Sequence, residues 1–131
     1  MAIIDHSSQP REDWRAGVTT RMRVSALTGG KQLTIFEQWC DPGLGAPPHF
    51  HPVEEVLSVI EGSAEIWAEG SESVIVSTGQ SVLVSVGQRH KFRNCGREQL
   101  HIQCILASPI FDATYDDGTV SRRWYVDRGK E

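Results

Sequence analysis

The sequence predicts an all-β protein, built as a sandwich or as a closed barrel. Three observations predict it. The middle of the chain contains short runs rich in β-branched and aromatic residues, Gly, Pro, Asp and Ser separate these runs, and no convincing stretch has the period of an amphipathic helix. Regular short strands joined by glycine turns are typical of sandwiches and closed barrels.

The first expected elements form a hairpin. Met22–Leu27 and Leu33–Cys40 are rich in strand-forming residues and flank Thr28–Lys31, which contains two glycines and reads as a turn. Asp41–Pro48 follows, and its three prolines and two glycines predict a loop.

The remaining strands of the predicted barrel follow at short intervals. Val53–Ile60 and Ala64–Ala68 flank a glycine turn at Glu61–Ser63. The later strands are expected at Val74–Ser77, Ser81–Val86, His90–Asn94 and Gln99–Leu106. The whole series predicts at least eight strands in a barrel over residues 21–108.

The two ends of the chain differ from this pattern. Residues 1–20 are mostly polar and predict an N-terminal arm docked by Trp14. Residues 109–131 predict a C-terminal extension with a hairpin turn at Asp116–Gly118 and an aromatic strand at Trp124–Val126. Because edge strands need cover, we expect both ends to pack on the barrel or on a partner subunit, in a homodimer.

Composition narrows the class of protein. A chain of 131 residues fits one domain, and a net charge of −4 does not favour nucleic-acid binding. No run is long and apolar enough to span a bilayer, and the polar N-terminus is unlike a secretory signal. Cys40, Cys95 and Cys104 are odd in number without Cys-x-x-Cys spacing, which predicts free thiols and a cytoplasmic protein.

Several side chains of metal-ligand type share one predicted strand face. His49 and His51 are two residues apart, so both can reach the same ion. Glu55 keeps the same parity, although the bend at Pro52 leaves Glu54 open as an alternative. His90 would join from a distant strand. Three imidazoles and one carboxylate predict one divalent transition metal, which could be Fe, Mn, Ni, Co, Cu or Zn.

The spacing of these residues resembles the two motifs of the cupin family. The first run is Gly43, five residues, His49, one residue, His51, three residues, Glu55, six residues and Gly62. The second is Gly79, five residues, Ser85-Val86-Gly87, two residues, His90, three residues and Asn94, with Ser85 where the family usually has proline. The resemblance implies an antiparallel jelly-roll barrel, also called a double-stranded β-helix, with a metal in its mouth. It also implies the ligands His49, His51, Glu55 and His90, and the choice of Glu55 over Glu54.

Other residues could shape a substrate pocket. Phe92 shares the parity of His90 and is expected to point inwards beside the ion. Trp39, Trp67 and Gln103 are the larger or polar residues on neighbouring strands and are candidate pocket residues. His101 is the candidate acid–base group. Packing in the core or on the surface is the alternative reading of each.

Three functions agree with these residues. The first is a non-haem metal-dependent dioxygenase acting on a small chelating substrate. The second is a redox-neutral isomerase, epimerase or lyase that uses the ion as a Lewis acid. The third is a non-catalytic module that binds a small molecule. We expect no nucleic-acid or membrane partner, and the sequence lacks a glycine-rich phosphate loop and a Gly-x-Ser-x-Gly elbow.

Overall fold

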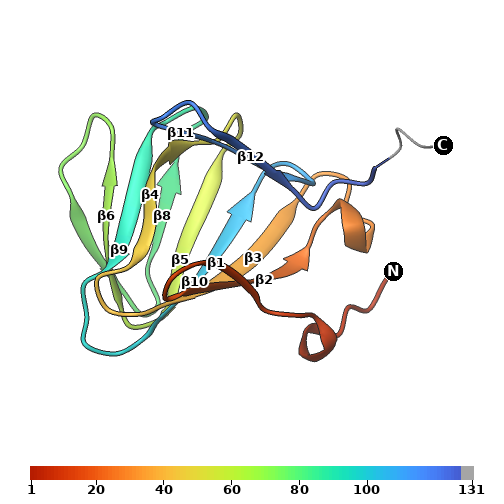
Figure 1. Ribbon diagram of the computed structural model, residues 1–131, viewed down its shortest axis with the longest axis horizontal. Helices are drawn as coiled ribbons and strands as arrows, with labels where there is room; N and C mark the ends of the chain where they lie inside the picture. Colours follow the sequence, from red (N-terminus) through yellow and green to blue (C-terminus); the bar gives the residue numbers. More distant parts are fainter. Residues whose placement is uncertain (128–131) are drawn as a thin grey trace.

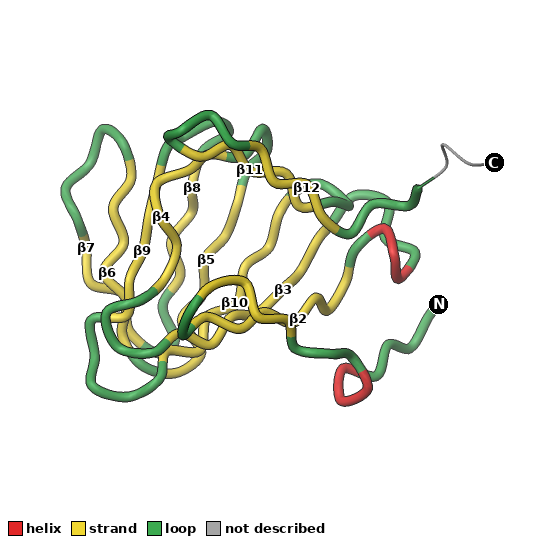
Figure 2. The backbone as a smooth tube through the Cα atoms, in the orientation of Figure 1, coloured by secondary structure: helices red, strands yellow, loops and turns green. Residues whose placement is uncertain are grey.

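The computed structural model describes residues 1–127, which form two facing six-stranded antiparallel sheets (Figures 1 and 2). The first sheet contains, in spatial order, β1 (Glu12–Arg15), β2 (Val18–Val24), β3 (Thr34–Cys40), β10 (Leu100–Leu106), β5 (Glu55–Glu61) and β8 (Ser81–Val84). The second contains β12 (Val120–Arg123), β11 (Phe111–Tyr115), β4 (Gly45–Phe50), β9 (His90–Asn94), β6 (Ser63–Ala68) and β7 (Val74–Ser77). The predicted all-β class is confirmed, and the two-sheet arrangement agrees with the predicted jelly roll.

Strand periodicity builds the core between the sheets. Along β10 every second side chain is buried, and these are Leu100, Ile102, Cys104 and Leu106. The same alternation on β9 buries His90, Phe92 and Asn94. Because successive side chains point to opposite faces of a strand, one face of each sheet supplies a single shared core.

The turn at Gly62 shows how the chain moves between sheets. β5 ends at Glu61 and β6 begins at Ser63, yet the two strands belong to different sheets. The corner therefore consists of one residue, and its φ of 99° is a conformation that glycine adopts without a steric penalty. The predicted turn is confirmed, as a corner between sheets rather than as a hairpin.

Two expected boundaries near the start of the barrel are wrong. The strand expected at Met22–Leu27 is Val18–Val24, and Ala26–Thr28 is a short 3-10 helix. The hydroxyl of Ser25 accepts a hydrogen bond from the Leu27 amide and caps this helix, which ends the strand early.

The loop expected at Asp41–Pro48 is also too long, because β4 already begins at Gly45. Its prolines fit a strand here since β11 pairs only with His49 and Phe50, so the preceding part of β4 is an edge.

Both terminal segments contribute edge strands. β1 lies at one edge of the first sheet, and the hairpin of β11 and β12 extends the second sheet (Figure 1). The hairpin turn at Asp116–Gly118 is confirmed, with Gly118 at φ 85°. The strand expected at Trp124–Val126 is wrong, because β12 ends at Arg123 and Trp124 has a left-handed φ of 64°. Residues 128–131 of the expected extension lie outside the described residues.

An aromatic cluster joins these terminal segments to the barrel. Trp14 of β1, Phe36 of β3, Phe111 of β11 and Trp124 all contact one another, with ring centroids 5.0–5.9 Å apart. Edge-to-face and tilted aromatic pairs of this kind stabilise a core beyond the area that they bury. The cluster fills the end of the sandwich where the two terminal strands meet.

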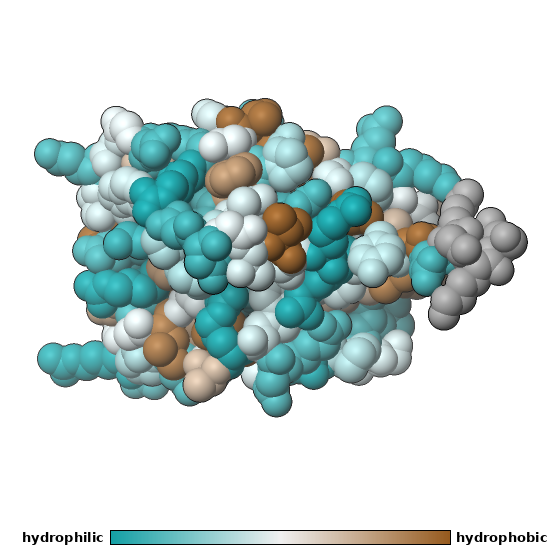
Figure 3. Space-filling view, turned by 45° about the horizontal axis from the view of Figure 1, so that its top comes forward, coloured by the Kyte–Doolittle hydropathy of each residue, from teal (hydrophilic) through white to brown (hydrophobic). Residues whose placement is uncertain are grey.

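The three cysteines form no disulfide within the described residues. All three cysteines are free thiols, as predicted, and Cys40 and Cys104 are buried. Figure 3 shows one face on which small apolar patches lie among hydrophilic side chains. Within residues 1–127 the structure contains no helix that is both long and apolar enough to cross a membrane.

Candidate metal centre

Four side chains of metal-ligand type converge between the two sheets. His49 lies near the end of β4, His51 follows this strand, Glu55 begins β5 and His90 begins β9. One ligand atom from each lies within 4.8 Å of the others. Their exposed fractions are only 6%, 2%, 2% and 1%, respectively, whereas Glu54 is exposed. The structure thus brings together the four side chains that the sequence predicted as metal ligands.

Strand pairing explains why these residues meet. His49 is directly opposite His90 in the antiparallel pair β4–β9, so both imidazoles project from the same face. The backbone carbonyl of His51 accepts a hydrogen bond of 2.9 Å from the Gly87 amide, which connects the chain after β4 to the turn before β9. Gly87 has a φ of 72°, so the turn keeps its shape although Ser85 replaces the usual proline.

Each histidine is oriented by a backbone carbonyl. Nδ1 of His49 lies 2.7 Å from the Pro47 oxygen, Nδ1 of His51 lies 2.8 Å from the Asp112 oxygen, and Nδ1 of His90 lies 2.8 Å from the Gln88 oxygen. A carbonyl oxygen can only accept, so each Nδ1 carries the proton and donates. The Nε2 lone pairs of all three rings therefore face the centre of the cluster.

The charge state of the cluster favours a cation. Burial alone raises the pKa of Glu55, but the adjacent imidazoles of His51 and His90 outweigh burial and lower it to about 2. Burial, together with His90 and His51, lowers the pKa of His49 to about 4. Burial also acts to lower the pKa of His51, but the nearby Glu55 carboxylate outweighs burial and raises the pKa of His51. At neutral pH the centre thus offers an ionised carboxylate and a neutral His49.

Two contacts show that the donor set fits a metal ion. Nε2 of His51 is buried without a hydrogen-bond partner and lies 3.4 Å from the Glu55 carboxylate. Nε2 of His90 lies 2.9 Å from the same carboxylate oxygen, again with the Nδ1 proton committed elsewhere. A ring nitrogen this close to a carboxylate needs either a proton on the ring or a cation between the two groups. Three nitrogens with one oxygen suit a divalent transition ion rather than Ca²⁺ or Mg²⁺.

The cavity beside these ligands is small and mostly apolar. Its volume is about 20 Å³, which is room for an ion or a water molecule. Aromatic and other apolar side chains supply most of the wall: Trp14, Phe36, Ala46, Leu57, Phe92, Cys104, Phe111 and Tyr115. Arg15 and Gln38 are the polar residues of the wall outside the ligand set. The predicted inward position of Phe92 agrees with this wall.

Three of the candidate pocket and catalytic residues lie on the other side of the first sheet. Trp39, His101 and Gln103 alternate with buried residues that face the core, so they point away from the ligands. The His101 ring stacks on Trp39 at 4.8 Å, and its Nε2 lies 2.7 Å from the Glu37 carboxylate. Gln103 accepts a hydrogen bond from Arg23. The structure does not bring these residues to the cavity.

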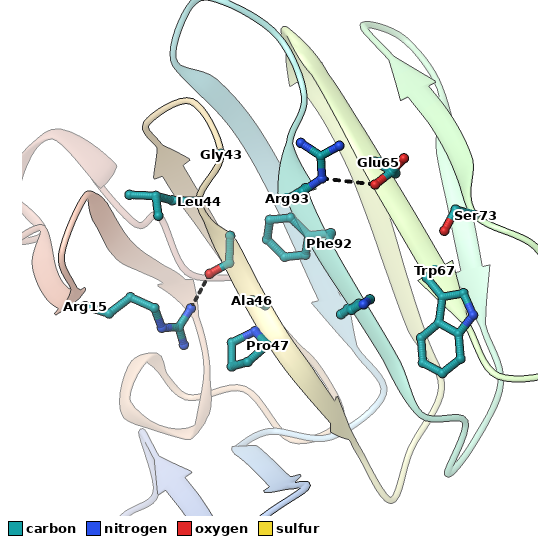
Figure 4. Close-up of a pocket in the computed structure, with 12 residues that line it drawn as sticks. Arg15, Gly43, Leu44, Ala46, Pro47, Glu65, Trp67, Ser73, Phe92 and Arg93 are labelled. Carbon is teal, nitrogen blue, oxygen red and sulfur yellow. Dashed lines mark hydrogen bonds and ion pairs between the residues drawn. The ribbon is translucent and has the colours of Figure 1, made fainter.

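Trp67 lies on the outer face of the second sheet. It lines a groove of about 390 Å³ together with Lys91, Arg93 and Glu65, of which the last two form an ion pair of 3.0 Å (Figure 4). Trp67 alternates with the buried Ile66, so its ring points away from the metal ligands. Arg15, Ala46 and Phe92 line both this groove and the cavity at the ligands.

Sequence reasoning missed several residues of the cavity wall. Trp14, Arg15, Phe111 and Tyr115 come from the terminal segments, where no motif fixes their spacing. Gln38 could have been found, because it shares the parity of the apolar residues Phe36 and Cys40 on the same strand. A polar residue in phase with a core face is a signal of a functional cavity.

Comparison with known proteins places this geometry in a family. Residues 38–106 match the model of the cupin domain, and no curated protein matches the chain with significant similarity. Among solved structures, the polyketide cyclase RemF from Streptomyces resistomycificus is 19% identical with a TM-score of 0.73, and the match covers 98% of this chain and 88% of that one. KdgF from Halomonas sp. is 18% identical with a TM-score of 0.70, covering 82% and 94%.

Oxalate decarboxylase from Lactobacillus farciminis, solved as a formate complex, is 15% identical with a TM-score of 0.75 over 85% of this chain and 34% of that one. At these identities the solved structures show a shared fold alone. The family match is stronger, since it spans more than half of the 131 residues and contains the whole set of His49, His51, Glu55 and His90. The chain belongs to the cupin family.

Proposed function

We propose that this cupin is a metal-dependent enzyme of the non-haem oxygenase type that acts on a small chelating substrate. His49, His51, Glu55 and His90 would hold one divalent transition ion. Four protein ligands on a six-coordinate ion leave positions for other molecules, so a bound ion would supply Lewis-acid or redox chemistry to a substrate and to oxygen.

The chain's own residues prepare this site in two ways. The carbonyls of Pro47, Asp112 and Gln88 fix the three imidazole rings before any ion binds, which lowers the cost of ordering them. The apolar wall excludes water from the centre and so strengthens electrostatic interactions inside it.

The observation that carries the oxygenase proposal is the character of the cavity wall. Proton-transfer chemistry needs an acid–base group near the substrate, and His101, the candidate for this role, lies on the opposite face of the first sheet. Among the described residues, the wall outside the ligand set is mainly aromatic and aliphatic. Such a wall suits an oxidation, which requires shielding from water more than proton transfer by the protein.

One residue favours a second candidate, a redox-neutral lyase or isomerase. Tyr115 lines the cavity, and its ring lies 5.6 Å from that of His49. Its hydroxyl could donate or accept a proton on a substrate bound at the ion. Replacing Tyr115 by Phe would abolish turnover in this case and would change an oxygenase much less.

Oxygen consumption separates the candidates. Protein loaded anaerobically with Fe(II) or Mn(II) would be mixed with small diols, diones and hydroxy acids, and oxygen uptake would then be followed with an electrode. Uptake that requires both substrate and His49 supports the proposal. Conversion without oxygen by the Zn(II) or Ni(II) form would favour the lyase or isomerase, and tight binding without conversion would favour a binding module. We expect the enzyme to act in the cytoplasm.

A further inference from the structure

The volume at the metal ligands raises the question of how a substrate reaches them. The cavity of about 20 Å³ cannot hold an organic molecule, whereas the neighbouring groove of about 390 Å³ can. The two spaces share three lining residues, Arg15, Ala46 and Phe92. A substrate that collects in the groove is therefore next to the wall of the metal cavity.

Part of β4, the strand that carries Ala46 of the shared wall, has no paired strand on one side within the described residues. β11 pairs only with His49 and Phe50, so the edge of β4 from Gly45 to Pro48 is free on that side. β1 lies across this gap, and it is itself an edge strand that pairs only with β2. Nη1 of Arg15 donates a hydrogen bond of 2.6 Å to the Gly45 carbonyl and spans the gap (Figure 4).

Arg15 is the side chain at this gap with donors to spare. A guanidinium carries five N–H donors, and here one of them is used by the Gly45 carbonyl. Among the described residues, the arginine–carboxylate pairs involve Arg21, Arg23, Arg89, Arg93, Arg122 and Arg123, and none involves Arg15. It is also the one lysine or arginine in the described wall of the metal cavity.

We propose that Arg15 binds an acidic oxygen of the substrate at the opening of the metal cavity. A carboxylate, phenolate or enolate would take the guanidinium from the Gly45 carbonyl, since charge-assisted hydrogen bonds are about twice as strong as neutral ones. Arg15 would then open the gap between β1 and β4 and hold the substrate's anionic end beside the ion. This inference rests on the proposed function, because it needs an ion at the four ligands.

The rest of the wall specifies the shape of the ligand. Five aromatic side chains line the cavity, and these are Trp14, Phe36, Phe92, Phe111 and Tyr115. Flat aromatic faces pack best against flat ligands. On the groove side, Lys91 forms no ion pair within the described residues and lies 5.8 Å from the Trp67 ring, which adds a positive charge and a flat surface on the path. The substrate class is a planar, conjugated organic acid that chelates through neighbouring oxygens or nitrogens.

Two planar chelators of different charge test this assignment. Picolinate carries a carboxylate, whereas 2,2′-bipyridine is neutral. Their dissociation constants for the Co(II)-loaded protein would be measured from changes in the visible cobalt spectrum, for the wild type, Arg15→Gln and Arg15→Lys. The matched control is Arg97→Gln, which removes the same charge from an exposed position.

We expect Arg15→Gln to weaken picolinate binding by about 10-fold or more and to leave bipyridine binding within about twofold, because one charge-assisted contact is lost. Arg15→Lys should recover part of the affinity, and Arg97→Gln should change neither ligand. Equal losses for both chelators, or no loss for picolinate, would overturn the proposed role of Arg15 but not the proposed function. A wild-type protein that takes up no cobalt would instead overturn the proposed function.

Discussion

At the scale of single residues, the geometry of the candidate metal centre depends on hydrogen bonds that the three histidines make on the side away from it. The three Nδ1 atoms donate to backbone carbonyls, which leaves three Nε2 lone pairs and one carboxylate facing a common point. Loss of a partner outside the ligand set typically costs about 10–100-fold in metal affinity. Loss of a ligand should cost more.

His51→Ala should therefore lower metal affinity by more than roughly 100-fold, while His101→Ala should leave it unchanged. The two variants remove the same side chain, one from the centre and one from the outer face of the first sheet. Elemental analysis after dialysis against limiting Mn(II) or Zn(II) measures the difference. Equal metal content in both variants would count against His51 as a ligand.

The pH dependence of the metal-free protein follows from His49. Its pKa is lowered from 6.5 to about 4 in the folded protein, so the unfolded chain binds more protons between these values. The stabilisation is fully present above pH 6.5 and is lost as the pH falls to about 4.

Two other groups of the centre also contribute to the pH dependence. Glu55, with its pKa lowered to about 2, adds stability above pH 4.5 that is lost at lower pH. The raised pKa of His51 acts in the opposite direction, since its stabilisation is present below pH 6.5 and is lost as the pH rises through the folded value.

The contribution of His49 can be isolated with His49→Asn. Between pH 4 and 6.5 the stability of the wild type relative to this variant should rise by up to about 3 kcal/mol. Urea unfolding of chelator-treated protein at several pH values gives this difference. A difference that is flat, or that falls with rising pH, would show that His49 is not held neutral by its surroundings.

Residue-scale prediction from sequence succeeded where spacing is fixed and failed where the phase of a strand was unknown. His49, His51, Glu55 and His90 stand at motif positions, so their convergence could be predicted. Trp39, His101 and Gln103 could not be assigned to a face, because alternation alone does not say which face is inside. Arg15 and Tyr115 lie on terminal strands that carry no motif.

At the scale of elements, the pair β4–β9 controls the geometry of the centre. β4 contains Pro47 and Pro48, and its register with β9 shifts between Ala46 and His49. Gly45 allows the two strands to approach closely, since a Cβ there would lie 2.2 Å from the Phe92 oxygen and 2.9 Å from the Arg93 Cα. Both contacts are with backbone, so a side chain would force the strands apart.

Gly45→Ala should destabilise the protein by about 1–3 kcal/mol, as overpacking does in other cores, and should also reduce metal content by moving His49 away from His90. Gly96→Ala is the matched control, because its Cβ would meet the Asn94 side chain at 3.4 Å and the Ser63 amide at 4.0 Å, both ordinary contact distances. Urea midpoints and elemental analysis report the two effects. Equal midpoints for the two variants would refute the close-approach argument.

The elements that sequence patterns misplaced have local causes. The capping hydroxyl of Ser25 converts the end of an expected strand into a 3-10 helix, and the free edge of β4 accepts prolines that were read as a loop. Trp124 leaves the strand pattern through a positive φ, which a bulky residue seldom adopts. Contacts with Trp14, Phe36 and Phe111 hold it there, and tertiary contacts of this kind are invisible in a local pattern.

At the scale of the whole molecule, the two sheets enclose a core from which solvent is excluded. Burial raises the pKa of the Cys40 thiol to about 12 and that of Cys104 well above its usual range, whereas Cys95 is partly exposed. A thiol-disulfide reagent should therefore modify one cysteine per native chain rapidly and all three after unfolding. Rapid modification of all three in the native protein would mean that the sandwich opens readily.

The assembly state is a second property of the whole molecule. Apolar side chains such as Leu83, Val86 and Ile75 are 63%, 65% and 58% exposed. Within residues 1–127 the sheets end in the edge strands β1, β7, β8 and β12, each paired on one side only. Such edges and apolar residues favour a partner, so we expect a homodimer. Light scattering should give twice the chain mass of 14.6 kDa, and a monomer at micromolar concentration would exclude the dimer.

The claim on which this account rests is that His49, His51, Glu55 and His90 bind one divalent transition ion. Anomalous diffraction from crystals of protein purified without a chelating resin and supplied with Mn(II), Fe(II) or Ni(II) tests it directly. The account predicts one peak between the sheets, about 2.0–2.2 Å from the three Nε2 atoms and a Glu55 oxygen. No peak at this position, with the three imidazoles turned away from one another, would contradict it.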